Sequence, residues 1–313
     1  MYYAPVIIPT LCRYEHFKKC MESLASNKWA ENTEIYLGLD YPGKEAHQKG
    51  YEEICEYLEK NTFPFKRVNV IKRECNYGVT RNVENLRDIV RQKYDRFIFA
   101  EDDNIFSENF LEYVDTMLEK IKDNDNVFGV CGYSYPVKYD EQKDCFYSFY
   151  VSSAFPAWGY GTFFKKRDKL IKEYDHKLLI DSVKKDNVSS WIRRLGNLFF
   201  AWYINRVCDQ NISYNDIDIQ LYQMLMGKMS VMPCKSLVRN MGWDGSGINC
   251  QTGTFDFSSQ EIYKGELTDM ILAQDFDREL EIWKFIDGLN SVSATTIIKS
   301  YIKYMLVRLG IKR

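Results

Sequence analysis

The chain has 313 residues, of which 45% are hydrophobic and 27% charged, a composition typical of a globular protein long enough to bury a sizeable core. Its formal net charge of -2 argues against a globally basic nucleic-acid-binding protein. Its nine cysteines include no Cys-x-x-Cys pair, which argues against a disulfide framework or a zinc site. We therefore expect reduced thiols, a cytoplasmic location and no nucleic-acid partner.

The first 131 residues predict an alternation of strands and helices. Apolar runs predict strands at 5–10, 34–39, 65–72, 96–100 and 127–131, and helical spacing predicts helices at 14–26, 44–60, 78–92 and 110–121. This alternation is typical of βαβ units and predicts an α/β fold with a mostly parallel sheet flanked by helices. Ligands of such sheets bind at the carboxyl ends of the strands, where residues 10–13, Asp40 and the acids at 101–103 should converge.

The second half has a mixed pattern. Residues 145–164 carry no charge, but Pro156, Gly159 and Gly161 argue against a membrane span and favour a buried strand followed by a site loop. Further on we expect helices at 165–186, 191–207 and 216–226, a strand at 231–238 and a glycine-rich loop at 242–253. We expect a catalytic domain over 1–257, with halves of about 1–135 and 136–257, and a C-terminal helical extension over 258–313.

The strongest site signal is the triplet Glu101-Asp102-Asp103. Three adjacent acids directly after the apolar residues 97–100 are costly unless a cation neutralises them. Mn²⁺ or Mg²⁺ bridging a diphosphate would do so, since these ions take carboxylate and phosphate oxygens. The alternative is a solvated acidic turn before the next helix, capped by Ser107.

An ordered set of motifs resembles the nucleotide-sugar half of family-2-like GT-A glycosyltransferases. The set runs through Pro9-Thr10-x-x-Arg13, Asp40, the segment Asn76-Tyr-Gly78-Val-Thr-Arg81-Asn82 and Glu101-Asp102-Asp103. The acidic triplet is similar to that of N-acetylglucosaminyltransferase I-like enzymes.

This resemblance implies a nucleotide-sugar donor, with UDP favoured over GDP or dTDP. The donor-binding positions that it implies are Thr10, Arg13, Asp40, Gly78, Arg81, Glu101 and Asp102. Asp40 would contact the nucleobase, Arg81 would lie near the nucleotide, and Asp103 would ligate the metal.

Two later segments continue the resemblance. Trp158 and Gly159 match a Trp-Gly loop that lines the acceptor and donor-sugar pocket, although a buried Trp beside a tight turn would look the same. The segment from Asn240 through Asp244 to Gly247 matches a glycine-rich loop that can order over a diphosphate. Related enzymes often place a His shortly after this loop, where this chain has Asn249, so we expect Asp103 as the direct protein ligand.

Two acids at the start of the helix at 216–226 are candidates for the base that deprotonates the acceptor hydroxyl. The resemblance implies an Asp or Glu at this point, and spacing from the Asn240 segment favours Asp216 over Asp218. The alternative for either residue is a helix N-cap.

The function implied is an inverting, metal-dependent glycosyltransferase. Its acceptor would be a glycan or lipid-linked glycan in surface-polysaccharide synthesis, such as capsule or O-antigen, at the cytoplasmic face of the inner membrane. A sugar nucleotidyltransferase is the first alternative, but residues 5–15 lack the glycine-rich phosphate loop expected of one. A non-catalytic glycan-binding protein is the second, and it would be expected to lose the acids.

The C-terminal segment differs in charge from the rest of the chain. From 288 to 313 it has no Asp or Glu and five basic residues, and apolar residues recur at Ile298, Ile302, Met305 and Leu309. A basic amphipathic helix can make peripheral contact with an anionic membrane. The alternative is a helix docked on the domain with a solvated basic face.

Overall fold

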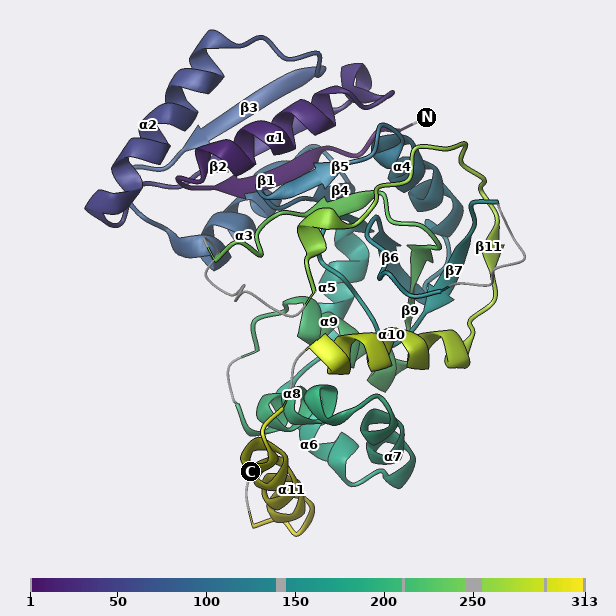
Figure 1. The fold of residues 1–313 in the computed structure, drawn as a ribbon. Coiled ribbons are helices and arrows are strands. Elements are labelled where there is room, and N and C mark those ends of the chain that lie inside the picture. Colours follow the sequence, from purple (N-terminus) through teal and green to yellow (C-terminus); the bar gives the residue numbers. More distant parts are fainter. Residues whose placement is uncertain (1, 139–144, 210–211, 246–254, 290–291, 312–313) are drawn as a thin grey trace.

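A computed structural model describes residues 2–138, 145–209, 212–245, 255–289 and 292–311. Over these ranges its main feature is a nine-stranded sheet with the order β11-β7-β9-β6-β8-β4-β1-β2-β3 (Figure 1). The strands are β1 (Val6–Thr10), β2 (Glu34–Leu39), β3 (Arg67–Lys72), β4 (Arg96–Phe99), β6 (Val127–Cys131), β7 (Ser148–Val151), β8 (Tyr160–Phe163), β9 (Met229–Pro233) and β11 (Ile271–Leu272). A separate two-stranded ribbon pairs β5 (Asn104–Phe106) with β10 (Val238–Asn240).

The sheet is mostly parallel. Pairings β1–β2, β1–β4, β2–β3, β6–β9 and β7–β11 are parallel, whereas β8 runs antiparallel to β4 and β6, and β7 runs antiparallel to β9. The predicted α/β class is therefore confirmed. The uncharged stretch 145–164 contains two buried strands, β7 and β8, where the sequence predicted one strand and a loop.

Helices alternate with many of the strands along the chain, and several of them pack against the sheet. They are α1 (Tyr14–Ala25), α2 (Glu45–Lys60), α3 (Gly78–Arg91), α4 (Phe110–Ile121), α5 (Phe164–Glu173), α6 (His176–Val183), α7 (Asp186–Arg194), α8 (Asn197–Cys208), α9 (Asp216–Met226), α10 (Phe276–Leu289) and α11 (Ala294–Arg308). Helix α3 packs on β1, β2 and β4, and α4 packs on β6 and β8. Within the described ranges, no helix combines the length and apolar composition needed to cross a bilayer.

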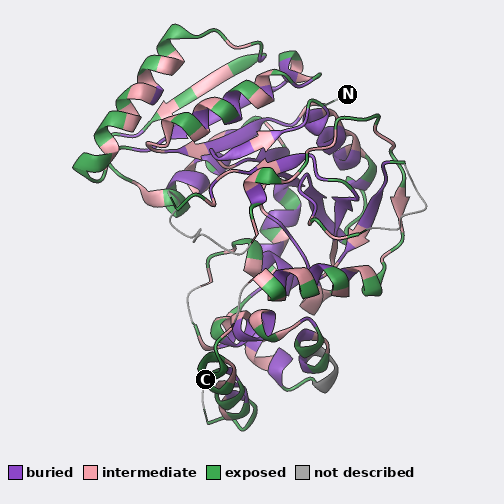
Figure 2. Ribbon diagram, viewed as in Figure 1, coloured by how far each residue is buried: buried purple, intermediate pink, exposed green. Residues whose placement is uncertain are grey.

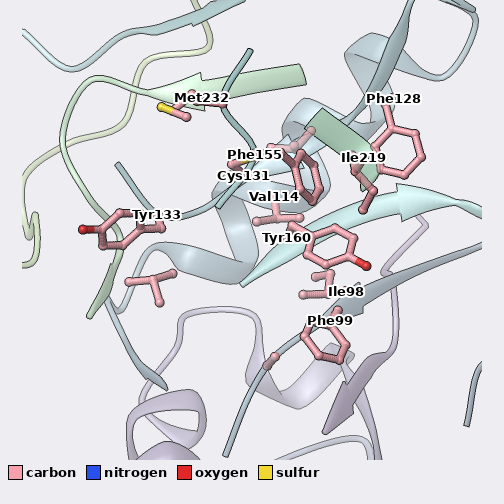
Figure 3. Packing of buried hydrophobic residues seen from close by; sticks show 14 of the residues in the cluster. Ile98, Phe99, Val114, Phe128, Cys131, Tyr133, Phe155, Tyr160, Ile219 and Met232 are labelled. Atoms are coloured by element: carbon pink, nitrogen blue, oxygen red, sulfur yellow. The ribbon is translucent and has the colours of Figure 1, made fainter. Parts of the chain in front are cut away.

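The hydrophobic core lies between the sheet and these helices. Figure 3 shows Ile98 of β4, Val114 of α4, Cys131 of β6 and Tyr160 of β8 gathered in one cluster. The rings of Phe155 and Tyr160 meet edge to face, with centroids 4.9 Å apart. Figure 2 shows buried residues along the central strands, because both faces of this part of the sheet are covered.

The C-terminal third of the chain is joined to both the sheet and a group of helices. Strand β11 extends the sheet beside β7, and Trp283 of α10 packs on Phe199 of α8 with ring centroids 4.4 Å apart. Helices α6, α7, α8 and α11 contact one another and form the lower lobe in Figure 1. The predicted boundary between 257 and 258 stays a prediction.

Three predicted elements are wrong in extent. The helix expected at 165–186 is two helices, α5 and α6, because the backbone is extended at Tyr174 and Asp175. The helix expected at 191–207 is broken at Gly196, which has φ +116°, a backbone conformation that favours glycine. The strand expected at 231–238 is two strands, because β10 leaves the sheet and pairs with β5. Strand β5 has only three residues, too few for the periodicity of its sequence to reveal it.

A buried carboxyl group generates the first testable expectation. Asp115 on α4 is fully buried, and its Oδ1 accepts a hydrogen bond from the Ala4 amide at 3.0 Å, while Oδ2 has no partner among the described residues. Burial raises the pKa of Asp115 to about 7, although the Ala4 amide opposes the shift. The folded state therefore favours the protonated carboxyl, and stability falls as the pH rises from about 4 to about 7.

Asp115→Asn should remove this pH dependence. We expect the unfolding free energy of the variant minus that of the parent to increase between pH 4 and pH 8, by up to about 4 kcal/mol. Urea unfolding at several pH values measures it, with the exposed Asp88→Asn as the matched control. A difference that does not change with pH would contradict this account of Asp115.

Candidate functional site

The acids that follow β4 are held by a single cation from the segment that follows β1. Arg13 pairs with Asp102 through Nη2 and with Asp103 through Nη1, the latter at 2.8 Å. Thr10, at the end of β1, donates its hydroxyl to Asp102 Oδ2 at 2.9 Å. Since β1 and β4 are parallel neighbours, their carboxyl ends meet and bring these residues together, as the sequence predicted.

Charge within this cluster is only partly balanced. Burial raises the pKa of Glu101 well above its usual range, and the negative charges of Asp103, Asp102 and Asp216 raise it further. Burial would lower the pKa of Arg13, but the two carboxylates beside it outweigh that effect and keep it firmly protonated. One guanidinium thus faces three carboxyl groups, and a further cation would find favourable electrostatics here.

The β5–β10 ribbon brings a distant segment onto Asp103. Antiparallel pairing sets Asn240 opposite Asn104, and the Met241 amide then donates to the carbonyl oxygen of Asp103 at 2.9 Å. The Asn240 side chain donates to Asp103 Oδ1 at 3.2 Å. A Cβ on Gly242 would lie 2.2 Å from Asp103 Oδ2, so only glycine lets this backbone approach the carboxylate.

The same segment reaches α1 through a second contact. His16 Nε2 lies 2.9 Å from Asp244 Oδ2, which ties the end of the described loop to the helix that begins beside Arg13. The sequence did not single out His16 or Asn240 as site residues. Asn240 was visible as the start of the glycine-rich motif, whereas nothing in the local sequence around His16 indicated its partner. The continuation of that motif, including Ser246, Gly247 and Asn249, lies outside the described residues.

Asp40 organises the turn that begins α3. Its Oδ1 accepts from the amides of Tyr41 at 2.9 Å and Tyr77 at 2.7 Å, and its Oδ2 accepts from the Gly78 amide at 2.9 Å. Gly78 has φ +71° with open space around it, so backbone conformation rather than crowding requires glycine there. Asp40 thus joins the end of β2 to the start of α3, and its predicted contact with a nucleobase stays a prediction.

Arg81 is exposed at this turn. Its guanidinium lies over the Tyr77 ring, 3.7 Å from the centroid, and Arg73 lies 5.0 Å from the same centroid. Arg73 is buried and donates to Asn82 and Asn85, whereas the Arg81 side chain is open to solvent. Arg81 therefore offers a cation near the carboxyl end of β2.

The predicted Trp-Gly loop leads into β8. Trp158 is half-buried, and its ring stands edge to face with Tyr133 at 4.7 Å, Phe257 at 5.4 Å and Trp243 at 6.4 Å between centroids. Gly159 has φ +67° and is crowded by the side chains of the β5–β10 ribbon and α4. Trp243 immediately precedes Asp244, so the aromatic cluster joins the Trp-Gly loop to the segment that covers Asp103.

The two candidate bases on α9 have different surroundings. Asp218 has no exposed surface, and its carboxylate is bound by Arg206 Nε at 3.0 Å, the Tyr174 hydroxyl at 3.2 Å and the Ser213 amide at 3.1 Å. Its carboxylate is enclosed by these bonds and ties α8 and α9 together. The N-cap of α9 is Asn215, whose side chain accepts from the Asp218 amide, so neither Asp caps the helix.

Asp216 lies at the exposed start of α9. It is exposed at the surface, yet surrounding protein limits its hydration and raises its pKa, with Asp218 adding to the shift. Its charge in turn adds to the rise in the pKa of Glu101, after burial and the charges of Asp103 and Asp102. Of the two candidates, Asp216 is the one whose side chain is open to solvent.

The carboxylate of Asp103 could bind a hard divalent ion, but few other protein side chains could serve as further ligands of that ion. Its Oδ1 is shared by Asn104 and Asn240, and its Oδ2 is paired with Arg13. In the part of the chain that the structure describes, no group of three or more His, Cys, Asp or Glu side chains could hold a metal. An ion on Asp103 would take its other ligands from phosphate and water, as Mg²⁺ often does.

A pocket of about 210 Å³ lies elsewhere, at the amino end of β6. Several lysines line it, but Lys166 is committed to structure: its Nζ donates to the carbonyl oxygens of Ile121, Asn124 and Val127. The pocket is separate from the acids, which lie at the carboxyl ends of the strands.

No family model and no curated protein matches the sequence. Among solved structures, the chain resembles S. aureus TarS, with a TM-score of 0.31 and 13% identity over 45% of this chain and 23% of that one. TarS residues 1–349 in complex with UDP-GlcNAc give a TM-score of 0.32 and 17% identity over 44% of this chain and 37% of that one. The mannosyltransferase PcManGT from Pyrobaculum calidifontis, in complex with GDP-Man and Mn²⁺, gives 0.40 and 10% identity over 71% and 69%.

The chain thus spans well under two thirds of the length of these TarS chains. TM-scores this low assign no function, and the function has to be inferred from the site.

The contrast between the two acids of α9 is testable by substitution. Asp218→Asn should lower the free energy of unfolding by about 3 kcal/mol, because Arg206 keeps its charge but loses its buried partner. Asp216→Asn should change it by less than about 0.5 kcal/mol, since that side chain is exposed. Urea unfolding followed by circular dichroism measures both, and equal effects would contradict the assignment of Asp218 to the scaffold.

Proposed function

We propose that this chain is a nucleotide-sugar-dependent glycosyltransferase. The observation that carries the proposal is the convergence at one edge of the sheet. Arg13, Asp102 and Asp103 are in direct contact there, and Asp216 is close enough for its charge to act on Glu101. Acids that can share a divalent ion with a diphosphate thus lie within electrostatic range of a carboxylate that can accept a proton.

The donor would bind with its diphosphate near Asp103. Arg81 is exposed beside the start of α3 and supplies positive charge for phosphate, while Asp40 holds the turn from which it projects. When Mn²⁺ or Mg²⁺ is bound, it supplies Lewis-acid stabilisation of the leaving diphosphate. Asp103 would hold it, and Arg13 would have to share or yield that carboxylate.

Asp216 would act as the general base. Its carboxylate takes the proton of an acceptor hydroxyl as the acceptor oxygen bonds to C1 of the donor sugar. The bond from C1 to the diphosphate breaks at the same time, and its electron pair leaves with the diphosphate. A raised pKa brings Asp216 closer to neutrality and so improves it as a base. Inversion at C1 rests on the family resemblance of the sequence motifs.

The half-buried aromatic cluster around Trp158 is the proposed acceptor or donor-sugar surface. Its aromatic rings offer apolar faces of the kind that stack on sugars, and Asp244 lies at its edge. UDP is the favoured nucleotide. We propose a glycan or lipid-linked glycan in surface-polysaccharide synthesis as the acceptor.

Nucleotide binding is the first test of this proposal. With UDP or GDP at about a hundred times its dissociation constant, the stabilisation should be about 2.7 kcal/mol, or about 5 °C in the thermal midpoint. We expect this shift to need Mn²⁺ and to be lost in Asp103→Ala, with the exposed Asp88→Asn as the matched control. No shift with any nucleotide would contradict the proposal and favour a glycan-binding protein.

Loss of the base tests the catalytic step separately. Asp216→Asn should keep the nucleotide-induced shift but lower kcat by about 10²-fold or more, because a general base typically contributes that much. In the parent enzyme kcat should fall as the pH drops through the raised pKa of Asp216, above the ordinary Asp value of 3.8. Release of nucleoside diphosphate from a panel of sugar nucleotides measures both. An Asp216→Asn variant with parental kcat would rule out this base.

A further inference from the structure

Helix α11 is docked through a side that its sequence does not mark as apolar. Ser300, Tyr304 and Val307 are its buried residues, with exposed fractions of 3%, 2% and 2%. They face α8, where the ring of Phe200 lies 5.7 Å from that of Tyr304. The buried residues are thus one small polar, one aromatic and one aliphatic, and Tyr301 at the edge adds a second ring whose centroid is 4.8 Å from that of Phe200.

The opposite side carries the apolar residues, and they face solvent. Ile298, Ile302, Met305 and Leu309 are 59%, 54%, 49% and 65% exposed. At about 100° per residue they fall in one narrow row along the helix, roughly opposite Val307. Figure 2 shows the exposed class along α11, and Figure 1 places this helix at the end of the molecule away from β1, β2 and β3. Exposed aliphatic rows of this kind mark an interaction surface.

Basic residues flank this row on both sides. Lys299 and Lys303 lie along one flank and Arg308 along the other, by the same helical spacing. Arg308 donates to the Tyr304 hydroxyl at 2.8 Å and Lys303 to Asn205 of α8 at 3.0 Å, so both are held on the sides of the helix, between the row and the docked residues. The chain has no Asp or Glu from 288 to 313 that could offset them.

We propose that this outward row binds an anionic lipid surface, with α11 lying in the plane of the membrane. The helix has 15 residues and is about 22 Å long. It would stay docked on α8 while the row on its far side enters the headgroup region. A second copy of the chain is a poorer occupant. In a symmetric dimer through this row the basic flanks would face their own copies, and like charges would repel. An anionic lipid surface would bury the apolar row and place negative charge beside the basic flanks.

The test is co-sedimentation of the full chain with vesicles. The parent should bind phosphatidylglycerol-rich vesicles and bind pure phosphatidylcholine vesicles at least about tenfold more weakly, and added salt should weaken the binding. Ile302→Glu/Met305→Glu should reduce affinity at least about tenfold, because it places charge in the apolar row. Lys299→Gln/Lys303→Gln/Arg308→Gln should reduce it by about fivefold per charge removed.

The matched control is Ile171→Glu/Met270→Glu, which places the same charges at exposed apolar residues of 40% and 39% exposure away from α11. It should bind as the parent does, and unchanged circular dichroism of all variants excludes misfolding. The proposal is overturned if anionic vesicles do not bind, or if the row variant binds as well as the control. A third result would also overturn it: light scattering shows that the parent is a dimer, Ile302→Glu/Met305→Glu is a monomer, and the parent does not bind vesicles.

Discussion

Two adjacent carboxylates, those of Asp102 and Asp103, lie buried beside the guanidinium of Arg13, and the rest of the site is arranged around this charge cluster. Buried acids are stable only when they are paired and hydrogen-bonded. Here the partners come from three directions. They are Thr10 at the end of β1 with Arg13 just after it, Asn104 in β5, and Asn240 at the end of β10. The requirement to satisfy one pair of acids therefore joins segments that are far apart in the chain.

The arrangement leaves the cluster short of positive charge. Arg13 cannot neutralise three carboxyl groups. Burial raises the pKa of Glu101, and the neighbouring negative charges raise it further. A dication on Asp103 would relieve the shortage of positive charge, and so would partial protonation of Glu101. The loop after β10 can lie against the Asp103 carboxylate because position 242 is glycine, where a Cβ would meet Asp103 Oδ2.

The lower lobe depends on a different constraint. Asp218 is buried with Arg206, so α8 and α9 are held together by an ion pair that neither helix could satisfy alone. Because α11 docks on α8 with Tyr304 and Val307, the apolar row of α11 is turned outward rather than into the core. One side of α11 thus belongs to the scaffold of this lobe, and the opposite side forms the proposed membrane surface.

Local patterns in the sequence were sufficient for much of the first half. Strands β1, β2, β4 and β6 and helices α1 to α4 follow from hydrophobic period and length, and the mostly parallel sheet follows from their alternation. The rule that strand ends share an edge correctly predicted that Thr10, Arg13 and the acids at 101–103 would meet. These features depend on near neighbours in the chain, which a sequence displays directly.

Tertiary structure alone decided the rest, because long-range pairings leave no periodic trace. The three-residue strands β5 and β10 exist only because they pair with each other, and without them Asn240 and Gly242 would not reach Asp103. Asp216 and Asp218 are two residues apart on one helix, and only packing shows that Arg206 encloses the second and leaves the first open. Likewise, composition marked α11 as basic and amphipathic, but only its docking on α8 showed that the apolar side faces outward.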